Sequence, residues 1–130
     1  MNIKHTKATV EQIWDNRDLL KSEEHRNVIH AVLAELDAGR LRCAEPTENG
    51  WQVNDWVKKA VILYFPIREM KTIHMPPFEY HDKMELKGDF VRQGVRVIPP
   101  ATARYGAYLA PGVVMMPSYV NIRANVDSGT

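Results

Sequence analysis

The sequence predicts an α+β protein in which an N-terminal helical domain with a short hairpin precedes the start of a left-handed parallel β-helix of hexapeptide repeats. Two patterns predict this arrangement. Apolar residues in the first half recur at spacings of three and four, as on one face of an α-helix, and a period of six begins near residue 102. We therefore expect a helical domain at residues 1–94 and the first coils of the β-helix at residues 95–130.

The period of six combines a bulky position with a small one. Each bulky residue is followed four places later by a small residue, and the pairs are Thr102 and Gly106, Tyr108 and Gly112, Val114 and Ser118, Val120 and Ala124, and Val126 and Thr130. Short strands separated by tight turns form the coils of a parallel β-helix with such a period. We expect the bulky residues to point into the coil and the small ones to occupy its corners.

Two helices are predicted near the N-terminus. Thr9 and Gln12 have the spacing of a capping box, which places a first helix at about residues 10–20. Ser22 can cap a second helix, whose apolar positions repeat at three and four until Gly39 supplies a C-terminal stop.

A third helix is predicted to begin after Asn54 and to end at Pro66, because proline lacks the amide donor that a helix needs. Its apolar positions form one face, and Lys58 and Lys59 are expected to point toward solvent.

Short strands are predicted at residues 41–45 and 51–53, joined by a turn at Asn49-Gly50. Residues 67–94 show no clear period and are expected to form a loop with little regular structure. Residues 95–98 are predicted as a strand that leads into the repeats.

Composition limits the function classes. The chain has 17 basic and 16 acidic residues, so no net field attracts it to nucleic acid or to an anionic membrane. Cys43 is the single cysteine and excludes an internal disulfide, and the longest apolar run, residues 60–65, is too short to cross a bilayer. With no signal peptide at the N-terminus, a cytoplasmic protein is predicted.

Generic catalytic and metal motifs are missing from the sequence. The five histidines do not occur at the spacing of a zinc helix, and none follows residue 81, so no metal site is predicted. No glycine-rich phosphate loop is present. Ser118 has no nearby histidine to act as its base, so it is interpreted as a corner residue and no catalytic residue is assigned.

Arg96 is the one candidate binding residue. It lies inside the apolar run Val95–Ile98, where the alternation of a strand turns it opposite to Val95 and Val97. Its guanidinium could hold a carboxylate through two hydrogen bonds. On the residues alone, an exposed strand arginine without a ligand is an equally good interpretation.

Two long runs resemble the tetrahydrodipicolinate N-succinyltransferases, the bacterial enzymes of the succinylase branch of diaminopimelate and lysine synthesis. The runs are LDAGRLRCAEPTENGWQVNDWVKKAVILYF at residues 36–65 and VRVIPPATARYGAYLAPGVVMMPSYVNI at residues 95–122. The segment Tyr80-His81-Asp82-Lys83 is similar to the family's Tyr-Phe-Asp-Lys. The matches keep the family's order from about residue 31 onward.

The resemblance implies an activity. It is the transfer of succinyl from succinyl-CoA, a co-substrate, to the amino group of ring-opened tetrahydrodipicolinate, with no bound cofactor. The resemblance also implies a homotrimer with active sites between neighbouring β-helices. Arg96 matches the family's substrate-binding arginine before its Val-Pro-Pro element, and a guanidinium there suits a dicarboxylate.

Two departures from the family qualify this expectation. Arg123 replaces a glycine at a coil turn, where a side chain is costly if φ is positive. The sequence ends at Thr130, before the family's acidic catalytic residue and its coenzyme groove. We therefore expect the chain to be an N-terminal portion that is inactive alone, and either to self-associate or to be poorly ordered beyond about residue 110.

Two alternative functions stay open. The chain could be a non-catalytic assembly or binding module that joins longer subunits through its helical domain and open coil. It could also belong to an acyltransferase for a different amine, in which case Arg96 would not contribute to the binding of a dicarboxylate.

Overall fold

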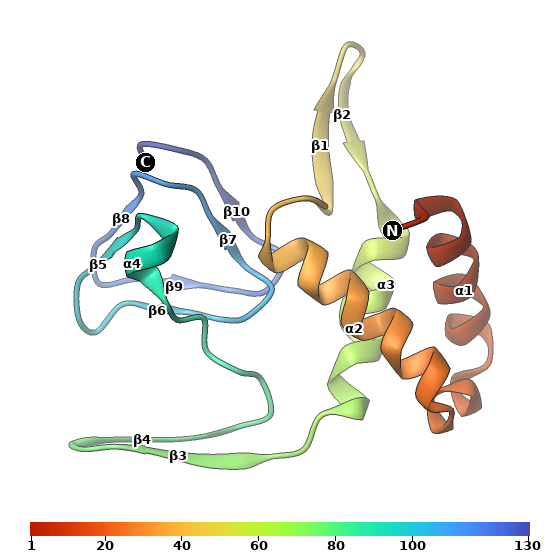
Figure 1. The fold of residues 1–130 in the computed structure, drawn as a ribbon, viewed down its shortest axis with the longest axis horizontal. Helices are drawn as coiled ribbons and strands as arrows, with labels where there is room; N and C mark the ends of the chain where they lie inside the picture. The colour runs from red at the N-terminus through yellow and green to blue at the C-terminus, as the bar shows by residue number, and fades with distance from the viewer.

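Helices and short two-stranded sheets make up the fold, and the computed structural model describes all residues from 1 to 130 (Figure 1). The helices are α1 (Ile3–Asp15), α2 (Glu23–Asp37), α3 (Asp55–Tyr64) and α4 (Phe90–Gln93), with 3-10 turns η1 (Arg17–Lys21) and η2 (Phe65–Ile67). The strands are β1 (Ala44–Thr47), β2 (Gly50–Val53), β3 (Lys71–Met75), β4 (Phe78–Asp82), β5 (Arg96–Val97), β6 (Thr102–Ala103), β7 (Tyr108–Leu109), β8 (Val114–Met115), β9 (Tyr119–Val120) and β10 (Asn125–Val126). The fold is of the α+β class, and none of its helices has the length and apolar character to cross a membrane.

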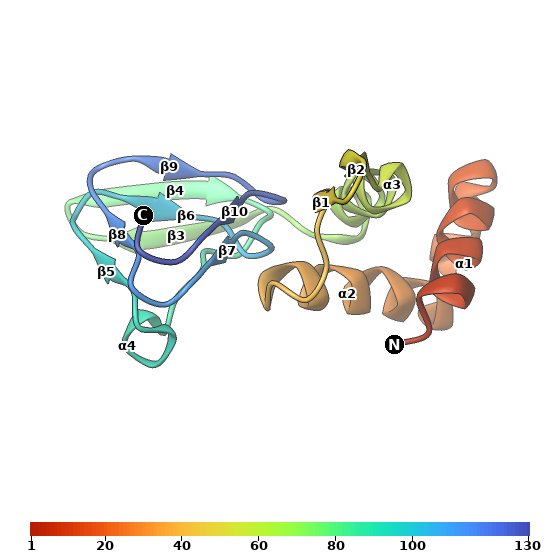
Figure 2. The ribbon, with the colours of Figure 1, turned by 90° about the horizontal axis from the view of Figure 1, so that it is seen from above.

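Helices α1, α2 and α3 pack around the larger of two apolar cores (Figure 2). Fully buried side chains from all three helices meet there, among them Val10, Ile13, Ile29, Leu33 and Leu63. Burying such a side chain contributes roughly 1.5–3 kcal/mol. A second cluster of six buried residues fills the interior of the C-terminal region. The predicted boundary near residue 94 stays a prediction.

The start of the first helix differs from the prediction. Helix α1 begins at Ile3, because the side chain of Asn2 accepts a hydrogen bond from the His5 amide at 3.1 Å and caps the helix there. Thr9 lies inside the helix, and its hydroxyl donates back to the His5 carbonyl at 3.1 Å. The capping box was therefore the wrong start signal, and the helix ends earlier too, at Asp15.

The second helix, the first hairpin and the third helix are confirmed. Helix α2 follows Ser22 and α3 follows Asn54, although neither side chain makes a capping hydrogen bond. Strands β1 and β2 form an antiparallel pair across the predicted turn, but β1 begins at Ala44, later than the predicted residue 41. Gly39, just beyond the end of α2, has a φ of 74°, which favours glycine. A Cβ on Gly39 would also lie 2.7 Å from the ring of Tyr108. The close approach brings the end of α2 against the C-terminal region.

The predicted loop at residues 67–94 is wrong. It contains the antiparallel hairpin β3–β4, in which Ile73 pairs with Tyr80 and Met75 pairs with Phe78, and the short helix α4. The hairpin is unpaired with any other strand and runs beside the C-terminal region in both views (Figures 1 and 2). Its polar outer face weakened the apolar signal in the sequence.

Residues 95–130, called the coil below, wind so that each of the first three strands pairs in parallel with the third strand after it. Strand β5 pairs with β8, β6 with β9 and β7 with β10. Arg96 lies beside Val114, whereas Thr102 lies beside Tyr119, so the spacing between paired residues shortens by one after β8.

This shortening corrects the predicted phase of the repeat. Val114 is 45% exposed and the following Met115 is 4% exposed, so the inward position in the first turn is one residue later than predicted. Ala103 and Leu109 are buried in the same phase. After the shortening the predicted phase holds, and Val120 and Val126 pack against the inner cluster.

Corners of the winding chain have positive φ values. The glycine corners are Gly106, Gly112 and Gly129, and Arg123 takes a φ of 81° at the corner next to Gly106. The corner therefore falls on Arg123, as the family resemblance predicted, and not on Ala124, as the period of six predicted. The expected strain is present, because a non-glycine residue in the left-handed region costs about 1–2 kcal/mol.

Replacing Arg123 with glycine should stabilise the protein. We expect Arg123→Gly to raise the free energy of unfolding by about 1 kcal/mol, because glycine adopts the φ of this corner without steric cost. Urea unfolding followed by circular dichroism would measure the change. A loss of stability would show that the arginine side chain makes contacts that outweigh the backbone strain.

A matched pair of glycine substitutions should separate backbone strain from steric contact. Gly39 and Gly50 both have positive φ, but a Cβ on Gly50 meets nothing within 4 Å. We expect Gly39→Ala to destabilise the protein by about 1–3 kcal/mol more than Gly50→Ala, because only Gly39 lies against Tyr108. Equal losses in urea unfolding would contradict the close packing between α2 and the coil.

Candidate functional site

The predicted binding residue Arg96 lies on the outer face of strand β5. Its amide donates to the Val113 carbonyl at 3.0 Å, while its side chain is exposed and has no hydrogen bond or ion pair within the chain. Val95 on the preceding position is 7% exposed and Val97 is half-buried. The predicted alternation is therefore confirmed, and it leaves the five donors of the guanidinium available to a ligand.

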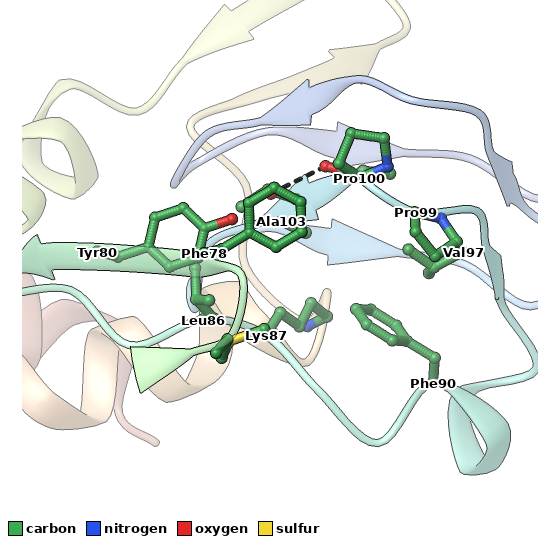
Figure 3. A pocket seen from close by; sticks show the side chains of 12 residues that line it. Phe78, Tyr80, Leu86, Lys87, Phe90, Val97, Pro99, Pro100 and Ala103 are labelled. Atoms are coloured by element: carbon green, nitrogen blue, oxygen red, sulfur yellow. Dashed lines mark hydrogen bonds between the residues drawn. The ribbon is translucent and has the colours of Figure 1, made fainter. Parts of the chain in front are cut away.

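An apolar slot lies beside this strand, between the hairpin β3–β4 and the coil (Figure 3). Its volume is about 260 Å³. Phe78 and Tyr80 line it from the hairpin, and Val97, Pro99 and Pro100 line it from the segment after Arg96. Arg96 itself does not line the slot, but the next residue, Val97, does. The exposed guanidinium and the apolar slot are therefore neighbours along strand β5.

A polar cluster closes one end of the space under the hairpin. The guanidinium of Arg104 donates to Asp82 at 2.8 Å and to the side chain of Asn121 at 3.4 Å, and the Tyr119 hydroxyl donates to the same Asn121 oxygen at 3.1 Å. Arg104, Asp82 and Tyr119 border a smaller pocket of about 210 Å³. The cluster joins the base of the hairpin to two successive turns of the coil.

A buried ion pair joins the helical core to the coil. Lys87 is 7% exposed, and its ammonium donates to the Asp37 carboxylate at 2.7 Å and to the Asp37 carbonyl at 3.0 Å. The same carboxylate oxygen accepts the Gly106 amide at 2.9 Å. A lysine rarely becomes this buried without a partner, and here both charges are paired.

Two other residues, Lys59 and Cys43, have structural roles in the fold. Lys59 was predicted to point to solvent, but it forms an ion pair with Glu11 at 2.8 Å and joins α3 to α1, while Lys58 is exposed as predicted. Burial raises the pKa of the Cys43 thiol, and the nearby charges of Arg123 and Lys58 lower it by less. A thiol with a raised pKa is a weak nucleophile at neutral pH, which favours a structural role for Cys43.

The sequence predicted the outward direction of Arg96 but not the ion pair, the polar cluster or the slot. Lys87 and Asp37 are 50 residues apart in the sequence, and no motif spacing connects them. Alternating polar and apolar residues from Lys71 to Asp82 were the one signal for the wall of the slot, and the prolines at the turn obscured it.

Comparison with known proteins assigns the family. A model of the tetrahydrodipicolinate N-succinyltransferase N-terminal region matches residues 5–67. A 2,3,4,5-tetrahydropyridine-2,6-dicarboxylate N-succinyltransferase of Bordetella petrii is 46% identical and aligns with 88% of this chain. This chain belongs to the tetrahydrodipicolinate N-succinyltransferase family. The resemblance of the two sequence runs is thereby confirmed.

Other N-succinyltransferases of the same name align with nearly the whole chain. The relative from Polynucleobacter asymbioticus is 42% identical over 95% of this chain, and the one from Parvibaculum lavamentivorans is 37% identical over all of it. These alignments cover 46–50% of the three relatives. The chain thus spans about half the length of the curated relatives it matches and corresponds to an N-terminal portion of them.

Breaking the buried ion pair should strongly destabilise the protein. We expect Asp37→Ala to lower the free energy of unfolding by roughly 3 kcal/mol, because it leaves the buried Lys87 ammonium without its anion. The exposed pair of Arg92 and Asp89, at 3.2 Å, provides the control. Arg92→Ala should change stability by less than about 0.5 kcal/mol. Similar losses for both variants in urea unfolding would show that the buried pair does not hold the two parts together.

Proposed function

We propose that this chain provides the N-terminal half of an enzyme that transfers a succinyl group from succinyl-CoA to the amino group of ring-opened tetrahydrodipicolinate. The family membership supports the reaction, since the relatives carry the name of a dicarboxylate N-succinyltransferase. A reaction of this kind belongs to lysine and diaminopimelate synthesis.

The position of Arg96 is the observation that carries the proposal. It is an exposed arginine without an internal partner, on a strand held by hydrogen bonds to the next turn of the coil. A planar guanidinium on a fixed strand suits a carboxylate, which it can bind through two parallel hydrogen bonds. A dicarboxylate substrate offers such a group, so Arg96 is assigned to substrate binding.

The chemistry is direct acyl transfer. The free amine of the substrate attacks the thioester carbonyl of succinyl-CoA, a base removes the proton from the attacking nitrogen, and hydrogen-bond donors stabilise the oxyanion until coenzyme A leaves. The contribution proposed for this chain is the orientation of the dicarboxylate by Arg96. No residue of the chain is assigned as the base.

The proposal extends to the architecture around the site. The three parallel strand pairs and the positive-φ corners support the start of a left-handed parallel β-helix of hexapeptide repeats. A homotrimer in the cytoplasm, with active sites between neighbouring subunits, is the assembly that the family resemblance favours. Light scattering on a chain of the relatives' length would test the trimer.

The test of the function is a chimera. Residues 1–130 would replace the matching half of the Bordetella petrii relative, and release of coenzyme A would be followed with tetrahydropyridine-2,6-dicarboxylate as acceptor. We expect turnover by the chimera and none by residues 1–130 alone. We also expect Arg96→Ala to raise KM for the dicarboxylate by about 10- to 100-fold, which is the effect of losing a charged hydrogen bond.

Arg92→Ala is the matched control. It removes the same charge from an exposed position on α4, four residues before Arg96. It should leave the KM for the dicarboxylate and the KM for succinyl-CoA unchanged. An unchanged KM for the dicarboxylate in Arg96→Ala would favour an acyltransferase for another amine. Turnover by the isolated 130-residue chain would contradict the expectation that the second half is needed.

A further inference from the structure

The hairpin β3–β4 has one apolar and one polar face. The pairs Ile73–Tyr80 and Met75–Phe78 lie on one face, because paired residues of an antiparallel ladder share a face and alternate along the strands. The rings of Phe78 and Tyr80 stack on this apolar face, with their centroids 6.5 Å apart. The pairs Thr72–His81 and His74–Glu79 occupy the opposite face and interact across the strands.

The apolar face is turned toward the coil but is not packed against it. Tyr80 borders both the 260 Å³ slot and the 210 Å³ pocket, and Phe78 and Met75 border the slot. Phe78 is nevertheless 51% exposed and Met75 47% exposed. Apolar side chains from the coil side, among them Val97, Pro99 and Pro100, face them across the space (Figure 3). Two complementary apolar surfaces are thus held apart.

All hydrogen bonds and ion pairs that join the hairpin to the rest of the chain lie at its base. Asp82 binds Arg104 at 2.8 Å, the Lys83 ammonium donates to the Phe65 carbonyl at 3.2 Å, and Arg68 binds Glu85 at 2.8 Å. Residues 71–81 form hydrogen bonds only within the hairpin. A two-stranded ribbon without further partners is only marginally rigid, so the hairpin can pivot about its base.

We infer that the hairpin β3–β4 is a lid that closes its apolar face onto the slot beside β5 and β6. Closure brings Phe78 and Met75 onto Pro99, Pro100 and Val97 and removes these side chains from water, which favours the closed state. The closed lid covers residues 97–100, which follow Arg96 in the chain. The inference depends on the geometry of the hairpin and not on the proposed reaction.

A disulfide trap tests closure in the 130-residue chain. Phe78→Cys and Ala101→Cys, combined with Cys43→Ser, place one thiol on the apolar face and one on the opposite wall of the slot. A disulfide needs Cβ atoms about 3.5–4.5 Å apart, so the rate of cross-linking measures how often the apolar face of the hairpin reaches the opposite wall of the slot. Oxidised glutathione should cross-link this variant in most molecules, as shown by mass spectrometry after a tryptic digest.

The control moves one thiol to the other face of the same strand. Glu79→Cys replaces Phe78→Cys in an otherwise identical variant, and its side chain points away from the slot. We expect cross-linking at least about tenfold slower than in the test variant, because this face never meets the coil. Equal rates, or no cross-link in either variant, would overturn the lid.

Hydrogen exchange of the unmodified chain gives a measurement that does not depend on the substitutions. The hairpin amides that donate across the β3–β4 pair should exchange at least about tenfold faster than the hydrogen-bonded amides of helix α2. Asp82→Asn should accelerate exchange in the hairpin further, because it weakens the ion pair with Arg104 at the base. Hairpin exchange as slow as that of α2 would show a rigid hairpin and would overturn the inference.

Discussion

The ion pair between Asp37 and Lys87 connects the two halves of the molecule. One carboxylate at the end of α2 receives the Lys87 ammonium at 2.7 Å and the Gly106 amide at 2.9 Å. It thereby fixes the end of a helix, the segment before α4 and the first glycine corner of the coil relative to one another. A buried ammonium without this partner would carry a large desolvation cost, so the three segments have one favourable arrangement.

The coil is covered on one side as a consequence of this contact. With Lys87 held in place, its amide donates to the Ala103 carbonyl at 2.8 Å, and the Tyr105 amide donates to the Glu85 carbonyl at 2.9 Å. Strand β6 therefore has hydrogen-bond partners on both sides, whereas β9 pairs with β6 alone. The helical core continues into the coil through Ile122, which is buried in it.

The candidate site combines a charged group and an apolar space on opposite sides of one strand. Arg96 points out from β5, and Val97 lines the slot beneath the hairpin. Strand alternation produces this division, and the pairing of β5 with β8 makes it rigid. A ligand bound by Arg96 would therefore lie on one face of β5, and the closed lid would lie on the other face, over Val97.

The sequence by itself determined the elements that depend on nearby residues. Helix α2, helix α3, the β1–β2 hairpin and the outward direction of Arg96 follow from apolar spacing, turn residues and alternation within a few positions. Contacts between distant residues decided the rest: the pairing of Thr102 with Tyr119 set the phase of the repeat, and the hairpin β3–β4 lies where its base binds Arg104. Local patterns specify conformation but not partners, and so the pair of Asp37 and Lys87 emerged only from the tertiary structure.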